Sequence, residues 1–129
     1  MWWDPNVQVS LAFSNLQHYE TQISADPKRA GHLIACAMMN RSEHESNNVF
    51  YVSFDHGRTW THALTMPDSV DPACVIGPDG TAFAASIHDV MQPDGSSPSF
   101  LDVHRSADGA APGKSRRFES IPAARTAVT

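Results

Sequence analysis

Short apolar runs separated by polar turn residues dominate the chain. Pro, Gly, Asn and Asp interrupt these runs about every eight to twelve residues, and no window keeps the i, i+3, i+4, i+7 apolar spacing of an amphipathic helix. This pattern is typical of an all-β protein. The predicted strands are Gln8–Phe13, Thr21–Ala25, His32–Met39, Val49–Phe54, Thr59–Leu64, Ala73–Ile76, Ala82–Ile87, Phe100–Arg105 and Arg117–Ile121.

Several of these runs recur at a nearly constant offset. Glu20–Pro27 aligns with Asp71–Pro78 at an offset of 51 residues, and Leu33–Met38 then aligns with Ala82–Ile87. Further on, Phe50–Asp55 aligns with Val103–Asp108 at an offset of 53 residues. Chance similarity between short β-runs is the alternative, but separate stretches agree on nearly one offset. A unit of about four strands therefore occurs twice, with a period in the range of propeller blades.

One turn between two predicted strands has the form S-x-D-x-G-x-T-W, and it is filled by Ser53, Asp55, Gly57, Thr59 and Trp60. Here the sequence resembles the Asp-box (BNR) repeats of sialidases and related propellers. The Asp carboxylate can accept turn amides, the Gly supplies a positive φ, and the Trp is an apolar plug beneath the hairpin. The resemblance implies a structural role, because in the resembling enzymes this turn lies on the face opposite the substrate.

A second, degenerate copy of the box keeps Ser106, Asp108 and Gly109 but carries extra residues, and Phe118 stands near the expected Trp. The flanking stretches Tyr19–Pro27 and Asp71–Thr81 look like the innermost strands of such propellers. The resemblance covers about residues 7 to 121. It is specific for architecture and weak for activity, because Asp boxes occur in sialidases, other glycoside hydrolases, sorting receptors and assembly factors.

The fold class predicted from repeat and resemblance is all-β, as a partial β-propeller of two four-stranded antiparallel blades plus an N-terminal outer strand at Val7–Phe13. We expect an N-terminal segment at 1–19, a blade with the Asp box at 20–69, a blade with the degenerate box at 70–121 and a tail at 122–129. On this interpretation the chain is a fragment of about two blades without a complete active site, and its uncovered faces favour self-association.

Composition and charge limit the classes of partner that are expected for this protein. The net charge is −5 and the nine basic residues are scattered, so a nucleic-acid partner is not expected. No apolar run is long enough to cross a bilayer, so a membrane role is not expected either. No signal peptide is expected at the start of this sequence, the resemblance allows a secreted full-length protein, and the location is left open. Cys36 and Cys74 lie in apolar runs without a CxxC, which favours buried free thiols.

Candidate chemistry lies in the loops that would form the substrate face of a propeller. Glu20 and Asp71 occupy the same repeat position and are the candidate catalytic residues, against the alternative of solvated loop carboxylates. Arg41 is a candidate ligand for a sugar carboxylate, but Arg58 and Arg105 fall elsewhere, so no three-arginine cluster can be assembled. The other acidic residues and histidines of these loops are Glu43, His44, Glu45, His88, Asp89 and Asp94.

Neither a cofactor nor a metal is expected. Glu43, His44 and Glu45 could bind a metal, but their spacing on an Asn/Ser-rich loop does not favour it. The resemblance implies a sialidase-like or other glycan-processing propeller protein, with a glycan as the partner of the full-length protein. The alternatives are a non-catalytic Asp-box propeller that serves as a binding or assembly platform, and an unproductive gene fragment.

Overall fold

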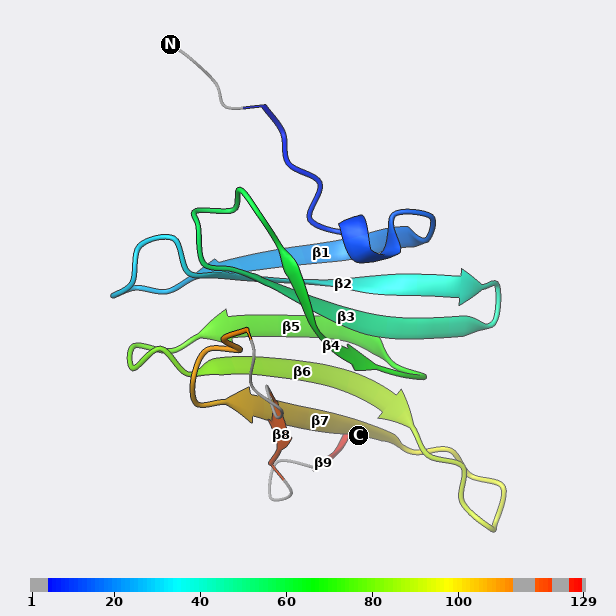
Figure 1. The fold of residues 1–129 in the computed structure, drawn as a ribbon. Coiled ribbons are helices and arrows are strands. Elements are labelled where there is room, and N and C mark those ends of the chain that lie inside the picture. The colour runs from blue at the N-terminus through cyan, green and yellow to red at the C-terminus, as the bar shows by residue number, and fades with distance from the viewer. Residues whose placement is uncertain (1–4, 113–117, 122–125, 129) are drawn as a thin grey trace.

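Two antiparallel sheets stacked face to face make up the protein (Figure 1). The structure is a computed structural model and describes residues 5–112, 118–121 and 126–128. It confirms an all-β fold with two four-stranded antiparallel sheets. The first sheet contains β1 (Gln17–Ala25), β2 (Leu33–Ser42), β3 (Glu45–Ser53) and β4 (Thr61–Met66), and the second contains β5 (Val70–Ile76), β6 (Ala82–Asp89), β7 (Ser99–Ser106), β8 (Glu119–Ser120) and β9 (Thr126–Val128).

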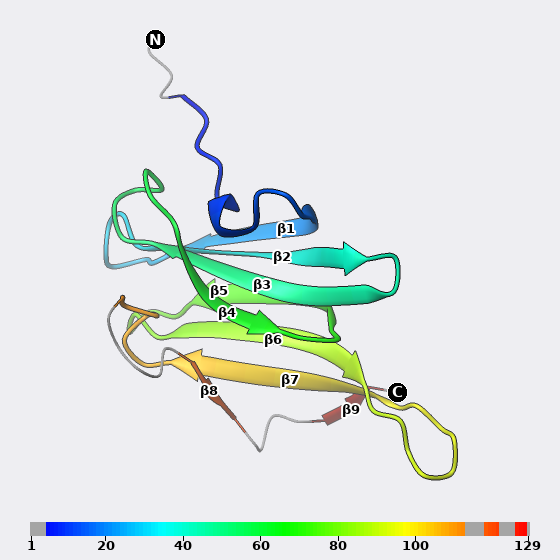
Figure 2. The same cartoon turned by 45° about the vertical axis from the view of Figure 1, so that its right-hand side comes forward.

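The short strands β8 and β9 share the fourth position of the second sheet. β8 pairs with His104 and Arg105 of β7, and β9 pairs with the other end of the same strand. Between them, the Ile121 amide donates to the Val103 carbonyl at 2.8 Å. β6 pairs with the other edge of β7. The strand positions of the second sheet therefore follow chain order, as they do in the first sheet (Figure 2). Arg117, the first residue of the predicted strand Arg117–Ile121, lies outside the described residues.

The N-terminal segment contradicts the predicted outer strand. Val9 and Ser10 form a turn, and Leu11–Phe13 form a 3-10 helix, η1, in which the Phe13 amide donates to the Ser10 carbonyl at 2.9 Å. This local folding lays Val9, Phe13 and Leu16 on the outer face of the first sheet. The apolar alternation that suggested a strand is therefore satisfied by packing on a sheet. No helix in the described part of the chain is long and apolar enough to cross a membrane.

The main core lies between the two sheets. The first sheet contributes Ile34, Phe50 and Val52, and the second contributes the small residues Ala82 and Ala84. All five side chains are almost fully buried. Since buried apolar area contributes roughly 25 cal/mol per Å², this layer is the main apolar contribution that holds the sheets together.

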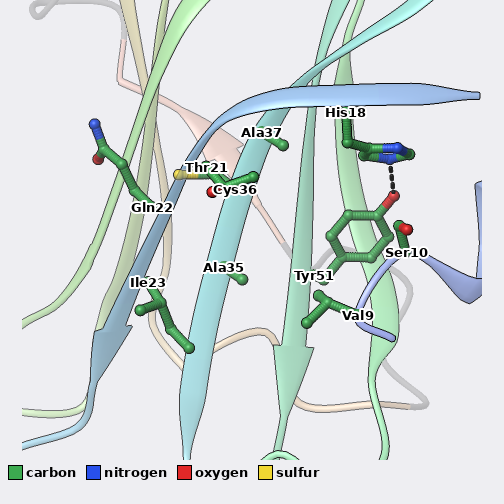
Figure 3. Close-up of a pocket in the computed structure, with 10 residues that line it drawn as sticks. All are labelled: Val9, Ser10, His18, Thr21, Gln22, Ile23, Ala35, Cys36, Ala37 and Tyr51. Atoms are coloured by element: carbon green, nitrogen blue, oxygen red, sulfur yellow. Dashed lines mark hydrogen bonds between the residues drawn. The ribbon is translucent and has the colours of Figure 1, made fainter. Parts of the chain in front are cut away.

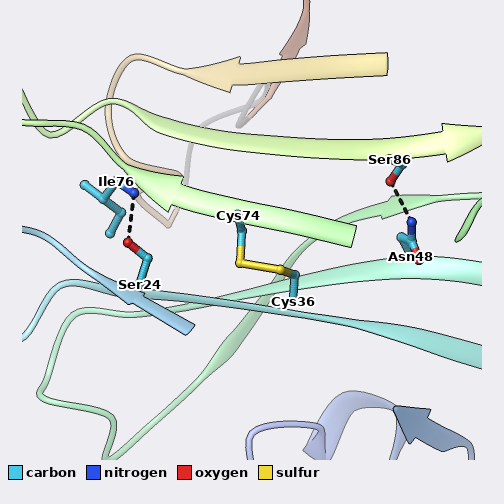
Figure 4. Close-up of a disulfide and its surroundings, with 6 residues drawn as sticks. All are labelled: Ser24, Cys36, Asn48, Cys74, Ile76 and Ser86. Carbon is cyan, nitrogen blue, oxygen red and sulfur yellow. Dashed lines mark hydrogen bonds between the residues drawn. A yellow bond between two sulfur atoms is a disulfide. The ribbon is translucent and has the colours of Figure 1, made fainter. Parts of the chain in front are cut away.

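A disulfide between Cys36 of β2 and Cys74 of β5 crosses this core (Figure 4). Their Cα atoms are 6.2 Å apart, so the predicted buried free thiols are wrong. The reason is the stacking of the two units: it brings the second strand of the first sheet opposite the first strand of the second. In the described residues no cysteine is free.

Hydrogen bonds also join the sheets at both ends of the core. Near the Asp-box end, the Ile76 amide donates to Ser24 Oγ at 3.2 Å. Towards the other end, the fully buried Asn48 donates its side-chain amide to Ser86 Oγ at 2.8 Å (Figure 4). The same amide donates to the Val70 carbonyl at 2.7 Å. These bonds restrict sliding of one sheet on the other, because buried polar groups are costly to leave unpaired.

Candidate functional site

The turn between β3 and β4 is held by two side chains of the Asp box. Ser53 Oγ accepts the Gly57 amide and donates to Asp55 Oδ1, both at 2.9 Å. The Asp55 carboxylate accepts the Thr59 amide at 2.8 Å and the Thr59 hydroxyl at 2.5 Å. The Thr59 hydroxyl, with the amide next in importance, lowers the pKa of Asp55 to about 2. This carboxylate is engaged by the turn itself.

Backbone geometry and one aromatic side chain complete this turn. His56 and Gly57 both have positive φ values, of 64° and 80°. Trp60 donates its indole N–H to the Gly57 carbonyl at 3.0 Å, and its half-buried ring packs on the outer apolar cluster of the first sheet. The ring thus ties the turn to the sheet, as an aromatic side chain with a polar edge can.

The turn after β7 repeats half of this arrangement. Ser106 Oγ donates to Asp108 Oδ1 at 2.7 Å and accepts the Ala110 amide at 2.8 Å, at the same spacing as in the first box. Gly109 and Ala110 have φ values of 67° and 63°. The position of Thr59 is taken here by Pro112, which has neither an N–H nor a hydroxyl to donate.

Phe118 does not pack in the way that Trp60 does. It packs against the core between the two sheets, together with residues such as Ile34 and Phe50. Trp60, in contrast, packs on the outer side of the first sheet. The two aromatic residues therefore belong to different layers of the molecule.

A buried histidine, His32, connects the two turns. Its Nδ1 is 2.9 Å from Asp26 Oδ2, and its Nε2 is 2.9 Å from the Gly109 carbonyl oxygen. Its ring stacks on Phe54 with the centroids 4.5 Å apart, and the Arg29 guanidinium lies 4.9 Å from the centroid of that same phenyl ring. The His32 hydrogen bond is the first cause of a lowered pKa of Asp26.

Sequence reasoning did not single out His32, and no local signal identifies it. Its acceptor on Gly109 lies 77 residues further along the chain. A Cβ atom at position 109 would collide with the His32 ring, so a glycine is needed there by this contact as well as by its positive φ. Beside the histidine lies an open, mostly polar hollow of about 380 Å³, lined by Lys28, Asp79 and Asp108 among others.

Glu20 and Asp71, the two candidate catalytic residues, lie side by side across the sheets. Each sits in an irregularity of the strand register, and their φ values are 53° and 51°. A non-glycine residue in this left-handed region costs about 1–3 kcal/mol, so both positions are strained in the same way. Both residues are exposed and line one open hollow of about 500 Å³, with Thr21, Gln22, Pro72 and Ala73.

This hollow lies away from the Asp boxes. Ala25 at the end of β1 pairs with Leu33, which pairs with Ser53 of the first box, whereas Tyr19 pairs with Met38 further along β2. The structure therefore brings Glu20 and Asp71 together towards the end of the sheets opposite the boxes.

The remaining candidates are dispersed. Arg41 and Glu43 line a different hollow, of about 310 Å³, together with residues of the segment before β1. Glu43 and His44 form the turn between β2 and β3, where the His44 amide donates to Ser42 Oγ at 3.4 Å, and Glu45 begins β3. In the described residues no group of three His, Cys, Asp or Glu side chains is placed to hold a metal ion.

The acidic residues of the long β6–β7 connection are engaged locally. Ser99 donates its hydroxyl to Asp89 Oδ1 at 2.5 Å. Ser96 donates its hydroxyl and its amide to Asp94 Oδ1 at 2.6 and 2.9 Å, and these bonds lower the pKa of Asp94. His88 pairs with Asp102, with Nδ1 and Oδ2 3.1 Å apart. These side chains shape the connection and do not reach the Glu20 hollow.

Comparisons with known proteins add no relative. No family model, no curated protein and no solved structure matches the chain. The likeness to Asp-box proteins therefore rests on the residues of the two turns and on the repeat.

Proposed function

We propose that the two sheets are consecutive blades of a sialidase-like Asp-box propeller protein, and that its role is glycan recognition. Two features support this proposal. Both sheets carry a Ser–Asp turn, at 53–57 and 106–110, in which the Ser hydroxyl donates to the Asp carboxylate and accepts the amide four residues on. Both first strands carry an acidic residue in the same left-handed conformation at the same repeat position.

The observation that carries the glycan proposal is the shared hollow of Glu20 and Asp71. Carboxylates accept hydrogen bonds from sugar hydroxyls, and two of them in one open hollow can grip adjacent hydroxyl groups. A backbone held in a sparsely populated conformation at both positions is a feature that clusters at binding sites. Since the charged lining is acidic, we propose a neutral oligosaccharide, not an acidic one, as the ligand of this hollow.

Binding, not hydrolysis, is the activity we assign to this hollow. A glycosidase acid must hold its proton at neutral pH, which usually requires a buried carboxyl group, and both carboxyl groups here are exposed. The expected result of a fluorogenic sialoside assay on this chain is no turnover. Turnover at enzyme-like rates would contradict the assignment.

The binding test is an NMR titration of the labelled chain with neutral oligosaccharides. We expect amide shifts at residues 19–22 and 70–73, which weaken in Glu20→Gln and Asp71→Asn. Asp79→Asn is the matched control, because Asp79 is an exposed carboxylate at the Asp-box end. Shifts that are unchanged in the first two variants, or lost equally in the control, would contradict the proposed site.

A non-catalytic assembly platform is the second candidate function. It is favoured by the apolar side chains that the second sheet turns away from the first, including Val75, which is 50% exposed. Protein association without any glycan-dependent shift would favour this candidate over the first.

A further inference from the structure

The repeat places equivalent residues on opposite sides of the two sheets. Ile34 and Cys36 of β2 face the second sheet, and their repeat equivalents on β6 are Phe83 and Ala85. Those equivalents point away from the first sheet, because they alternate with the buried Ala82, Ala84 and Ser86. We call the outward side of the second sheet the free face; it comprises Val75, Phe83, Ala85, Ile87, Leu101 and Val103.

In the repeat, the outer side of the first sheet corresponds to the side of the second sheet that packs against the first sheet. Ile23 is the repeat equivalent of Cys74, and Ala35 of Ala84. The strand register agrees, because Ile23 pairs with Ala35 as Cys74 pairs with Ala84. Ile23 is nevertheless 63% exposed, whereas Cys74 is covered by the neighbouring sheet.

An open hollow of about 310 Å³ lies over this part of the first sheet (Figure 3). Ile23, Ala35 and Ala37 form its apolar floor and side. The N-terminal segment covers the same face nearer to β3, where Val9 and Phe13 pack, and it leaves the β1 side open. We call this surface the recess.

Two polar side chains that line the recess, His18 and Tyr51, are already paired. His18 Nδ1 lies 3.0 Å from the Leu16 carbonyl, an acceptor, so Nδ1 carries the proton and Nε2 can accept the Tyr51 hydroxyl at 2.8 Å (Figure 3). Burial raises the pKa of Tyr51 to about 12, so it stays a neutral donor. The recess can therefore lose its water without leaving these groups unpaired.

We propose that copies of this chain dock head to tail, with the free face of one copy in the recess of the next. Within the chain, Cys36 and Phe50 pack against Cys74 and Ala84. The repeat equivalents of the first pair are Ala85 and Val103 on the free face, and those of the second pair are Ile23 and Ala35 in the recess. The contact between copies thus continues the stacking that already joins the two sheets. It is heterologous, so it repeats from copy to copy.

The sharpest test uses the equivalence with the native disulfide. Ile23→Cys and Ala85→Cys occupy the repeat positions of Cys74 and Cys36. When the two variants are mixed under mild oxidation, we expect a disulfide-linked dimer that contains one copy of each. Neither variant alone should dimerise comparably, because a head-to-tail contact never brings two copies of position 23, or two of position 85, together.

Peptide mapping identifies the linked cysteines and verifies that the native Cys36–Cys74 bond is retained. Homotypic dimers as abundant as the mixed dimer would overturn the proposal, since they indicate a different contact between copies. Absence of the mixed dimer would overturn it as well.

A charge on the free face gives an independent test. Val103→Glu places a carboxylate among the half-buried side chains of that face, and Thr61→Glu, at the exposed first residue of β4, is its matched control. We expect light scattering to show a mass that rises with concentration for the native chain and for the control, and a monomer for Val103→Glu with an unchanged circular dichroism spectrum. A native chain that stays monomeric at millimolar concentration would overturn the proposal, as would a Val103→Glu variant that is folded and still associates.

Discussion

Thr59 sets the protonation of the Asp-box carboxylate through two donors, its hydroxyl and its amide. Because the folded-state pKa of Asp55 is depressed to about 2, its contribution to stability is present above the unfolded value, near 4, and is lost as the pH falls towards about 2. Thr59→Val removes only the hydroxyl, so we expect the pKa of Asp55 to rise towards its ordinary value. Carboxyl ¹³C titration by NMR measures this.

The same substitution should also flatten the acid limb of the stability curve. Urea midpoints measured at pH 6 and pH 3 should differ less in Thr59→Val than in the native chain. An Asp55 titration that does not move in the variant would show that the hydroxyl bond is not the principal cause of the low pKa.

Trp60 and His56 contribute to the same turn in unequal ways. Trp60→Ala removes a half-buried ring and its bond to the Gly57 carbonyl, whereas His56 has an exposed side chain. Large aromatic truncations in full cores cost about 3–5 kcal/mol, so we expect about 2–3 kcal/mol for the half-buried Trp60 and less than about 1 kcal/mol for His56→Ala. Urea unfolding of both variants decides this, and equal losses would contradict a plugging role for Trp60.

Among the elements, β2 and β5 are joined covalently as well as by packing. Cys36 and Cys74 are 38 residues apart, and closing a loop of that length restricts the unfolded chain by about 3–4 kcal/mol. We expect reduction to lower the free energy of unfolding by about that amount. The Cys36→Ala/Cys74→Ala variant is the control, and its stability should not respond to the reductant. An equal response in both proteins would assign the effect to something other than this bond.

Most strands could be predicted from the sequence, because each is an apolar run between turn residues and eight of the predicted runs overlap an observed strand. The N-terminal run could not, because its apolar residues are satisfied by a turn and a 3-10 helix that pack on a sheet. β9 was missed since the tail has no run of strand length. The disulfide could in principle have been inferred from the repeat, because Cys36 and Cys74 lie on strands that come together when the two units stack.

The candidate site was predictable only in part. The shared repeat position singled out Glu20 and Asp71 in the sequence, and the structure places both in one hollow. Their left-handed backbone could not be foreseen, because nothing in an acidic residue demands a positive φ. His32 was missed because its role depends on a carbonyl in the other repeat.

At the scale of the whole molecule, His32 links the two sheets at the Asp-box end, while the disulfide links them within the core. Both ring nitrogens face acceptors, namely Asp26 Oδ2 and the Gly109 carbonyl. The ring therefore bridges a side chain that follows β1 and the backbone of the turn after β7. The Asp26 side chain is 3% exposed, so this contact is shielded from water.

Removing this link should loosen one end of the molecule without separating the sheets. His32→Ala leaves the Gly109 carbonyl, next to the fully buried Ala110, without this hydrogen bond, and it removes the stack on Phe54. We expect the free energy of unfolding to fall by about 2–4 kcal/mol. Hydrogen exchange should accelerate at residues 106–110, whereas the β2 amides beside the disulfide should remain protected. Arg29→Ala is the matched control, because it removes only the exposed guanidinium over Phe54 and should cost less than about 1 kcal/mol. If both variants leave exchange at 106–110 unchanged, the two turns are held by the sheets alone and His32 is not a link between them.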